Sequence, residues 1–201
     1  MIDRPIQSPE ILMNNTDIER VLLRMSHEIL EQKDHLNDLA FVGIKTRGEY
    51  LAHRFVSLVK GMGVRADFGT LDITLYRDDF DTLGDLTVGE TDLLFDVAGK
   101  RIILVDDVLH SGRTIRAALD QIIDFGRPAK IELACLVDRG GRELPITANY
   151  VGQTYQISSD EYIQVRLSEV DGEDQVIGFS KDHRGAKGHK YFSHSRKDLN
   201  N

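Results

Sequence analysis

The stretch 102–114 constrains the fold of this 201-residue chain more than any other part of the sequence. It begins with the apolar run 102–105 (IILV) and continues with two adjacent acids, Asp106 and Asp107. A short run that is apolar on both faces is typical of a strand in a parallel sheet covered by helices on both sides. Because ligands of such sheets bind beyond the carboxyl ends of the strands, we expect the two carboxylates to lie at a binding site.

The residues that follow the two acids predict an anion-binding loop. The segment 111–114 (SGRT) leads into an amphipathic helical pattern, and Gly112 allows the backbone to approach a ligand closely. The loop amides and the amino end of the helix attract a phosphate group. A phosphate beside two carboxylates indicates a phosphorylated sugar, whose ribose hydroxyls the acids would hold. The alternative is that Asp106 and Asp107 only cap a turn.

Strand and helix patterns alternate along the chain as far as residue 140, which predicts an α/β fold with a parallel sheet flanked by helices. A capping box formed by Thr16 and Glu19 predicts a first helix that runs to about Leu36. Two more helices are expected after Gly48 and after Thr114, because apolar residues recur there at helical spacing. Apolar runs predict the strands, at 40–44, 64–68, 71–75, 101–105 and 130–137.

We expect one domain over residues 1–179, since 201 residues suit a single core. Shorter strand patterns at 149–151, 162–167 and 176–179 predict a separate small unit, a hood over about 140–179. Residues 76–99 are rich in Asp, Gly and Thr and predict a long loop, which in a compact domain is usually functional. The polar residues 180–201 predict a disordered tail.

Composition narrows the functional class. The formal net charge of −8 argues against a strong, non-specific nucleic-acid binder. The single cysteine, Cys135, lies in an apolar run and is expected to be a buried small hydrophobe rather than a catalytic thiol. Since no apolar stretch reaches membrane-spanning length and residues 1–10 lack a signal core, we predict a cytoplasmic protein without membrane contact.

Residues 102–114 resemble the signature with which type I phosphoribosyltransferases bind 5-phosphoribosyl 1-diphosphate (PRPP). The segments 42–48 (VGIKTRG), 71–79 (LDITLYRDD) and 136–140 (LVDRG) are similar to one subfamily, the bifunctional pyrimidine operon attenuation regulators and uracil phosphoribosyltransferases. The resemblance runs from about Ile18 to Val176. It implies the type I phosphoribosyltransferase fold with a hood, and transfer of the phosphoribosyl group of PRPP to uracil, giving UMP and diphosphate.

The resemblance also implies a role for each matched residue. Thr46 and Arg47 would bind the diphosphate, and Arg77 on the long loop would close over it. Asp106 and Asp107 would hold the ribose hydroxyls, so the catalytic group is Asp106, Asp107 and Arg77. Mg²⁺ would accompany the diphosphate, and no protein residue is predicted as a metal ligand. The 5′-phosphate loop would consist of Val108, Leu109, His110, Ser111, Gly112, Arg113 and Thr114.

Arg139 and Ile163 would frame the base, by the same resemblance. A pairing of Arg139 with the neighbouring Asp138 is the alternative role for this arginine. His110 replaces an aromatic residue common in the family and is expected only to line the loop. A homodimer or larger homo-oligomer is implied as well.

The family's second role is control of pyrimidine genes by binding a leader mRNA in response to uridine nucleotides such as UMP and UTP. Arg24, His27 and Arg142 match residues that the family uses for RNA. Other RNA positions depart from the family pattern, and fewer phosphate contacts weaken RNA binding; the departures are Leu23, Gly141, Thr147 and Gln153. We therefore rank the enzyme first. The alternatives are an RNA-binding attenuation regulator with incidental activity, and a purine phosphoribosyltransferase.

Overall fold

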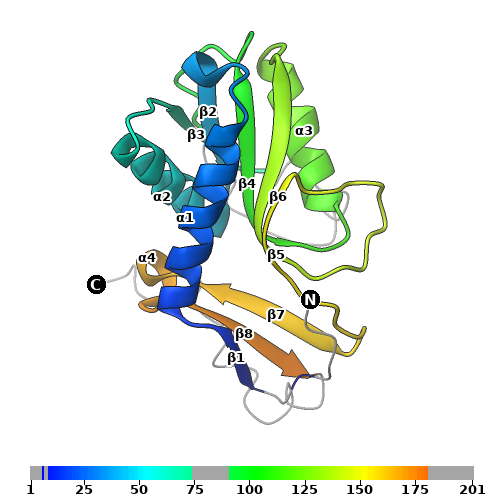
Figure 1. The fold of residues 1–201 in the computed structure, drawn as a ribbon. Helices are drawn as coiled ribbons and strands as arrows, with labels where there is room; N and C mark the ends of the chain where they lie inside the picture. The colour runs from blue at the N-terminus through cyan, green and yellow to red at the C-terminus, as the bar shows by residue number, and fades with distance from the viewer. Residues whose placement is uncertain (1–5, 7–8, 74–90, 181–201) are drawn as a thin grey trace, which may run out of the picture.

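The structure, a computed structural model, describes residues 6, 9–73 and 91–180 (Figure 1). A three-layer α/β unit lies above a small second sheet. In none of the described residues is there a helix long and apolar enough to cross a membrane. The elements are β1 (Glu10–Met13), α1 (Asn15–Glu31), a 3-10 turn (Leu36–Asp38), β2 (Leu39–Ile44), α2 (Arg47–Gly61), β3 (Asp67–Leu71), β4 (Arg101–Leu109), α3 (Arg113–Phe125), β5 (Lys130–Asp138), β6 (Tyr150–Thr154), β7 (Glu161–Arg166), α4 (Ser168–Asp171) and β8 (Gln175–Ser180).

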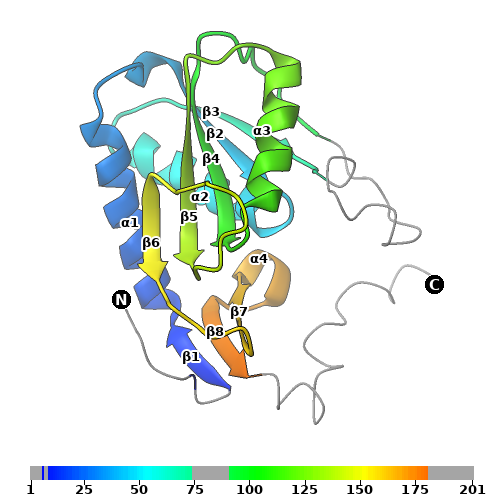
Figure 2. The same ribbon diagram turned by 90° about the vertical axis from the view of Figure 1, so that its right-hand side faces the viewer.

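The main sheet has five parallel strands in the order β3-β2-β4-β5-β6. Helices α1 and α2 cover one face and α3 covers the other, as the two ribbon views show (Figures 1 and 2). This arrangement confirms the predicted α/β class with a parallel sheet flanked by helices. It also explains why the strand patterns are almost wholly apolar, since both faces of each central strand are buried.

Alternate residues of each strand divide the core into two layers, as the strand period of two requires. Phe41, Ile103 and Leu136 pack with α1 and α2, whereas Leu104 and Cys135 pack with α3. The thiol of Cys135 is completely buried, which confirms that this residue is a small core hydrophobe.

A second sheet, antiparallel and in the order β1-β8-β7, lies below the carboxyl ends of the main strands (Figure 1). Its apolar residues belong to the same core layer as α1 and α2, among them Met13, Val165 and Val176. We call β1, β7, β8 and α4 the hood. The strand β1 was not anticipated, because four residues beside Pro9 give too short a pattern to detect.

Two predictions from local patterns are wrong, one about which sheet a strand joins and one about the ends of a helix. The strand predicted at 149–151 is β6, which pairs in parallel with β5 and closes the main sheet instead of joining the hood. The first helix begins one residue before Thr16 and ends at Glu31, not near Leu36. Its cap is Asn14, whose side chain accepts from the Asp17 amide at 3.0 Å, while the Asp17 carboxylate accepts from the Asn14 amide at 3.2 Å. Asn and Asp fill the capping box in place of Thr and Glu.

The prediction of two strands at 64–68 and 71–75 is also corrected. A single strand, β3, runs from Asp67 to Leu71 beside β2. Residue 74 and those after it up to 90 lie outside the described residues. Val64, counted in the first predicted strand, instead bonds back to the last turn of α2, where its amide donates to Val59 O at 3.0 Å.

A buried arginine fastens α1 to the amino end of the main sheet. Arg101 is 1% exposed and pairs with the Glu132 carboxylate at 2.6 Å and the Tyr150 hydroxyl at 2.9 Å. Its Nη2 and Nη1 also donate to the carbonyls of Ile29 and Gln32 at the end of α1. A cation at this position satisfies carbonyls that the helix itself leaves unpaired.

Candidate active site

The site lies where the order of the strands in the main sheet reverses. From β2 the chain moves to β3 on one side, and β4 lies on the other side of β2. The loops that leave the carboxyl ends of β2 and β4 therefore face each other across a switch point, which is where open α/β sheets bind ligands. The loop after β2 carries Thr46 and Arg47, and β4 carries Asp106 and Asp107 near its end.

Two glycines bring these loops together. A Cβ on Gly48 would lie 2.4 Å from the Val105 carbonyl oxygen, and a Cβ on Gly43 would lie 2.4 Å from the Gly48 carbonyl oxygen. Such distances are far shorter than a van der Waals contact, so only glycine permits the first turn of α2 to rest against β4. Thr46 and Arg47 are held beside the two acids as a result.

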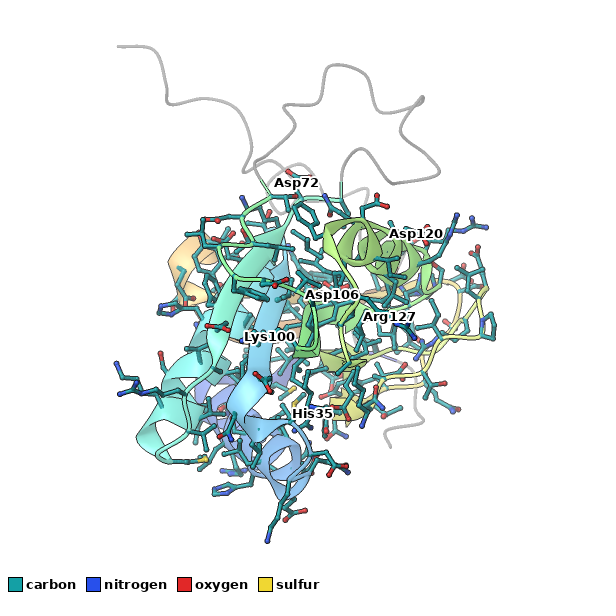
Figure 3. The ribbon with its side chains drawn as sticks, turned by 90° about the horizontal axis from the view of Figure 1, so that it is seen from above. His35, Asp72, Lys100, Asp106, Asp120 and Arg127 are labelled. Atoms are coloured by element: carbon teal, nitrogen blue, oxygen red, sulfur yellow. The ribbon has the colours of Figure 1, made fainter. Side chains whose placement is uncertain are left out.

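Asp106 and Asp107 are carboxylates in a largely dry setting. Asp106 is 7% exposed and lies in the interior of the molecule, in contrast to Asp120 on the outer side of α3 (Figure 3). The oxygen Oδ1 of Asp106 accepts from the Asp107 amide at 2.9 Å, and Oδ1 of Asp107 accepts from the Val108 amide at 2.8 Å. Burial raises the pKa of both carboxyls, and the charge of Arg47 partly offsets the rise in the pKa of Asp107. The remaining oxygens suit hydroxyl donors.

Arg47 bridges the loop after β2 to the hood. Its Nε donates to Oδ2 of Asp171 at 3.1 Å, and its Nη2 donates to Oδ1 at 2.8 Å. The Arg47 and Asp171 side chains are 26% and 15% exposed. Side-on pairing of this kind leaves Nη1 and one N–H of Nη2 available. A guanidinium thus stands between the hood and the buried acids.

The loop after β4 has the conformation of an anion site. Gly112 adopts a φ of 92°, which glycine accepts without strain, and α3 starts at the next residue. The cap residue Gly112 has no side chain, and the Arg113 amide at the start of α3 donates to the Ser111 hydroxyl at 3.3 Å. The amino end of a helix attracts an anion, so this loop suits a phosphate group. The Ser111 carbonyl accepts from the amides of Glu143 and Leu144 at 3.0 and 3.1 Å, which fixes the loop against the segment after β5.

Arg142 holds this segment in place. Its guanidinium donates to the Asp138 carboxylate at 2.6 Å and to the carbonyls of His110 and Ile146, both at 2.9 Å. The loop after β4 and the residues after β5 are therefore one hydrogen-bonded unit. Because Asp138 is taken by Arg142, the alternative pairing of Asp138 with Arg139 is wrong.

Arg139 points to the opposite side of this unit, toward the hood strand β7. Its Nη2 lies 3.4 Å from the Glu161 carbonyl oxygen, and its guanidinium carbon is 5.8 Å from the centre of the Tyr162 ring. Its Nε is buried without a hydrogen-bond partner in the part of the chain described. Burial lowers the pKa of Arg139. Arg139 and β7, which carries Ile163, thus form a half-buried wall. At least one N–H donor of this wall, Nε of Arg139, is unused in the described part of the chain.

The sequence profile of the phosphoribosyl transferase domain matches residues 9–169. Proteins called bifunctional protein PyrR are similar over most of their length. The protein of Listeria monocytogenes is 46% identical over 181 residues, covering 88% of this chain and 99% of its own. That of Thermus aquaticus is 51% identical over 173 residues, covering 85% and 96%.

The chain belongs to the bifunctional PyrR family of type I phosphoribosyltransferases. Solved structures of hypoxanthine phosphoribosyltransferases share this family's fold. One from Staphylococcus aureus has a TM-score of 0.62 at 21% identity, covering 87% of this chain and 93% of its own. One from Trypanosoma cruzi has a TM-score of 0.62 at 15% identity, covering 85% and 96%. Sequence identities this low show that the fold is shared, but they do not show that the substrate base is the same.

Most residues predicted from the resemblance to this family lie together. Thr46, Arg47, Asp106 and Asp107 meet at the switch point, and the predicted phosphate loop borders them at the end of β4. Arg139 is linked to the same strand by its amide, which donates to Leu109 O at 3.1 Å. Arg77 lies outside the described residues.

The residues predicted for RNA are separate from this group. Arg24 and His27 lie on α1, where Arg24 donates to the carbonyls of Val151 and Gly152 in β6 and pairs with Glu28. Arg142 is occupied by Asp138 and by the carbonyls of His110 and Ile146. Arg24 and His27 are both exposed, and of the three residues only His27 makes no hydrogen bond or ion pair with the described residues.

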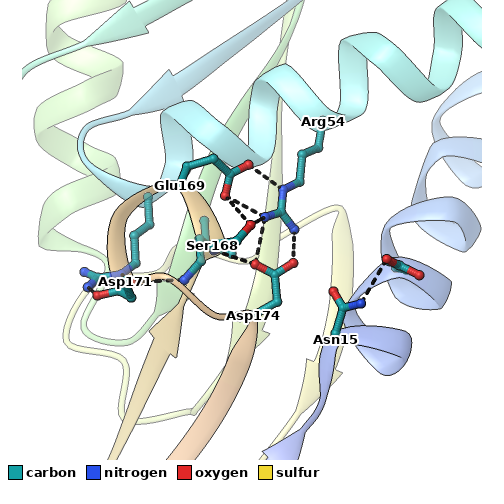
Figure 4. Close-up of polar contacts among 9 residues, drawn as sticks. Asn15, Arg54, Ser168, Glu169, Asp171 and Asp174 are labelled. Carbon is teal, nitrogen blue, oxygen red and sulfur yellow. Dashed lines mark hydrogen bonds and ion pairs between the residues drawn. The ribbon is translucent and has the colours of Figure 1, made fainter.

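Sequence reasoning missed the hood contribution. The helix α4 and the turn after it supply Asp171 to Arg47, and Glu169 and Asp174 to Arg54 (Figure 4). The only signal was the acid-rich segment 168–174 (SEVDGED), which resembles any solvated surface turn. Nothing in that segment indicates that its partners lie more than 100 residues earlier in the chain.

The donor set fits a magnesium ion that arrives with its substrate. No group of three or more acidic, histidine or cysteine side chains gathers as a metal site in the described part of the chain. Asp106 and Asp107 offer hard carboxylate oxygens, which suit Mg²⁺ when most other ligands are diphosphate oxygens and water.

Proposed function

We propose that this protein transfers the phosphoribosyl group of PRPP to uracil, forming UMP and diphosphate. The observation that carries the proposal is the meeting of three groups at one switch point: the carboxylates of Asp106, which is buried, and Asp107, which is partly buried; the amino end of α3; and the guanidinium of Arg47. They match the three polar parts of PRPP, its ribose hydroxyls, its 5′-phosphate and its diphosphate.

In this proposal the chain binds and orients, and no covalent intermediate with the protein is required. The loop from Val108 to Thr114 holds the 5′-phosphate, and Asp106 and Asp107 accept the ribose hydroxyls. Thr46 and Arg47 hold the diphosphate, with Arg77 as a further contact. The bond from ribose C1 to the diphosphate oxygen breaks, a bond from C1 to N1 of uracil forms, and the N1 proton leaves to solvent. Fixed positive charge at the leaving group favours this displacement.

Mg²⁺ bound to the diphosphate would neutralise part of its charge. Asp106 and Asp107 are the residues that would help to hold it. Water exclusion also matters, because a ribosyl centre that is losing its leaving group reacts readily with water.

The base site in this proposal is the wall formed by Arg139 and β7. Uracil presents two carbonyl oxygens, and Arg139 offers unsatisfied N–H donors, including the buried Nε. The backbone near Ile163 provides hydrogen-bonding groups of strand β7 on the other side. Nothing at this wall favours a purine over uracil, and the purine alternative stays last.

Regulation by leader RNA is the second candidate function. The bifunctional name of the relatives favours it. The guanidinium groups of Arg24 and Arg142 already bond to backbone carbonyls and carboxylates of this chain, so RNA would have to compete for them. We therefore propose RNA binding as secondary to the enzyme, and a homo-oligomer as its assembly.

The test is diphosphate release from PRPP and Mg²⁺ with each of uracil, hypoxanthine, guanine and adenine. We expect release with uracil only, and a loss of about 100-fold or more in the Asp106→Asn, Asp107→Asn variant, because the ribose is no longer oriented. The matched control is Asp120→Asn, an exposed aspartate on the outer side of α3, which should keep wild-type activity. If none of the four bases gives diphosphate release, the enzymatic function is refuted. Release with a purine would favour the purine phosphoribosyltransferase alternative.

A further inference from the structure

We infer that Asp171 of the hood is a positioning residue for PRPP, acting through Arg47. The inference rests on the proposed function, in which Arg47 contacts the diphosphate. Its basis is the two-point contact of Arg47 with Asp171, at 2.8 and 3.1 Å, between segments 124 residues apart in the chain.

The Asp171 carboxylate is itself fixed. Its Oδ2 accepts from the Leu167 amide at 3.0 Å, and the Asp171 amide donates to the Leu167 carbonyl at 2.6 Å. The acceptor is therefore held by the local backbone of α4 and does not depend on a flexible side chain. A guanidinium that is bound side-on to a fixed carboxylate keeps one orientation, and its Nη1 edge stays free for a second anion.

Asp107 would compete with Asp171 for Arg47, because the close approach at Gly48 holds the first turn of α2 against β4. The charge of Arg47 reaches Asp107 strongly enough to oppose the effect of burial on that carboxyl. Without Asp171, Arg47 would turn to Asp107 and pair with it. One movement would then remove the cation from the diphosphate and occupy a carboxylate intended for the ribose.

Simple electrostatics gives the opposite expectation. A carboxylate next to an anion site repels the anion, so neutralising Asp171 should strengthen PRPP binding if charge alone matters. The sign of the change in affinity therefore separates positioning from repulsion.

The experiment measures PRPP binding by calorimetry in Mg²⁺ without uracil, so that no turnover occurs. We expect Asp171→Asn to raise the Kd for PRPP by about tenfold, the scale of one charge-assisted contact. Asp171→Glu, which keeps a carboxylate, should recover part of the affinity. With uracil added, the change should fall on the KM for PRPP and leave the KM for uracil within about twofold.

Asp174→Asn is the matched control. It removes a hood carboxylate near Asp171 that pairs with Arg54, two turns after Arg47 on α2, and it leaves the Arg47 pair intact. We expect little change in the Kd for PRPP. An equal rise in both variants would overturn the inference, because the effect would then come from loosening the hood.

A double-mutant cycle with Arg47→Ala separates this inference from the proposed function. If Asp171 acts through Arg47, Asp171→Asn should have no further effect on PRPP binding in the Arg47→Ala background. Additive effects, or tighter binding in Asp171→Asn alone, would overturn the positioning role. Unchanged PRPP binding in Arg47→Ala alone would instead refute the proposed role of Arg47 in the diphosphate site.

Discussion

At the scale of single residues, the buried carboxylate of Asp106 favours the proposed function at the expense of stability. Asp106 is nearly inaccessible to water and has Asp107 as its neighbour, so burial and the adjacent charge both raise its pKa. A raised pKa in the folded state means that the ionised form destabilises the fold. In our proposal that ionised form is the one that accepts ribose hydroxyls.

We predict that Asp106→Asn stabilises the free protein at neutral pH. The carboxyl contributes most to stability below its unfolded pKa of about 3.9, and the contribution is lost as the pH rises through the raised folded pKa. The advantage of the variant in unfolding free energy should therefore grow from pH 4 to pH 8, by about 1.4 kcal/mol for each pH unit that lies between the unfolded and the folded pKa. Urea titrations across this range test it. An advantage that does not change with pH would contradict the explanation.

At the scale of elements, two arginines of α2 dock the hood onto the main unit. Arg54 donates to both oxygens of Glu169 at 2.6 and 2.9 Å and to both oxygens of Asp174 at 2.6 and 2.8 Å (Figure 4). Its hydrogen bonds lower the pKa of Glu169 and of Asp174. Arg47, two turns earlier on the same helix, holds Asp171 in the same way.

We predict that Arg54→Gln lowers the unfolding free energy by about 2 kcal/mol at pH 7, because two partly buried carboxylates lose their charged donor. Both acids have lowered pKa values, so this contribution is present above their unfolded values near pH 4 and is lost as the pH falls through the folded ones. The difference from wild type should shrink toward pH 3. The control is Arg20→Gln, whose exposed pair with Asp17 should contribute about 0.5 kcal/mol or less. Equal losses in both variants would argue against docking by Arg54.

At the scale of the whole molecule, the hood and the main sheet share a core. Val165 and Val176 of the hood belong to the same buried cluster as Phe55 of α2 and Leu136 of β5. The hood therefore has little apolar interior of its own, and its strands have no independent source of stability.

We predict a single cooperative unfolding transition in which hood and main sheet are lost together. The tyrosines report both parts, since Tyr150 lies in β6 and Tyr162 lies in β7. Denaturant curves followed by near-ultraviolet and far-ultraviolet circular dichroism should coincide. An earlier transition in the near-ultraviolet signal alone would contradict a single cooperative transition.

Local patterns were sufficient for the family, the parallel sheet and the signature loop. A buried strand, two acids and a glycine at the start of a helix are adjacent in sequence, and their chemistry is fixed by what each residue is. The main errors arose where the outcome depends on pairing. The pattern of β6 fits either sheet, and only its register with β5 decides which strand it joins.

The tertiary structure alone decided the partners of the charged residues. Asp171 pairs with Arg47 across 124 residues, and Arg142, expected to face RNA, turns back to Asp138 and the loop after β4. An ion pair forms where folding places two charges within reach after their burial has removed competing water, and the sequence gives no spacing for that event. The sequence by itself therefore determined which chemistry is available, and the fold determined which arginine is held for it.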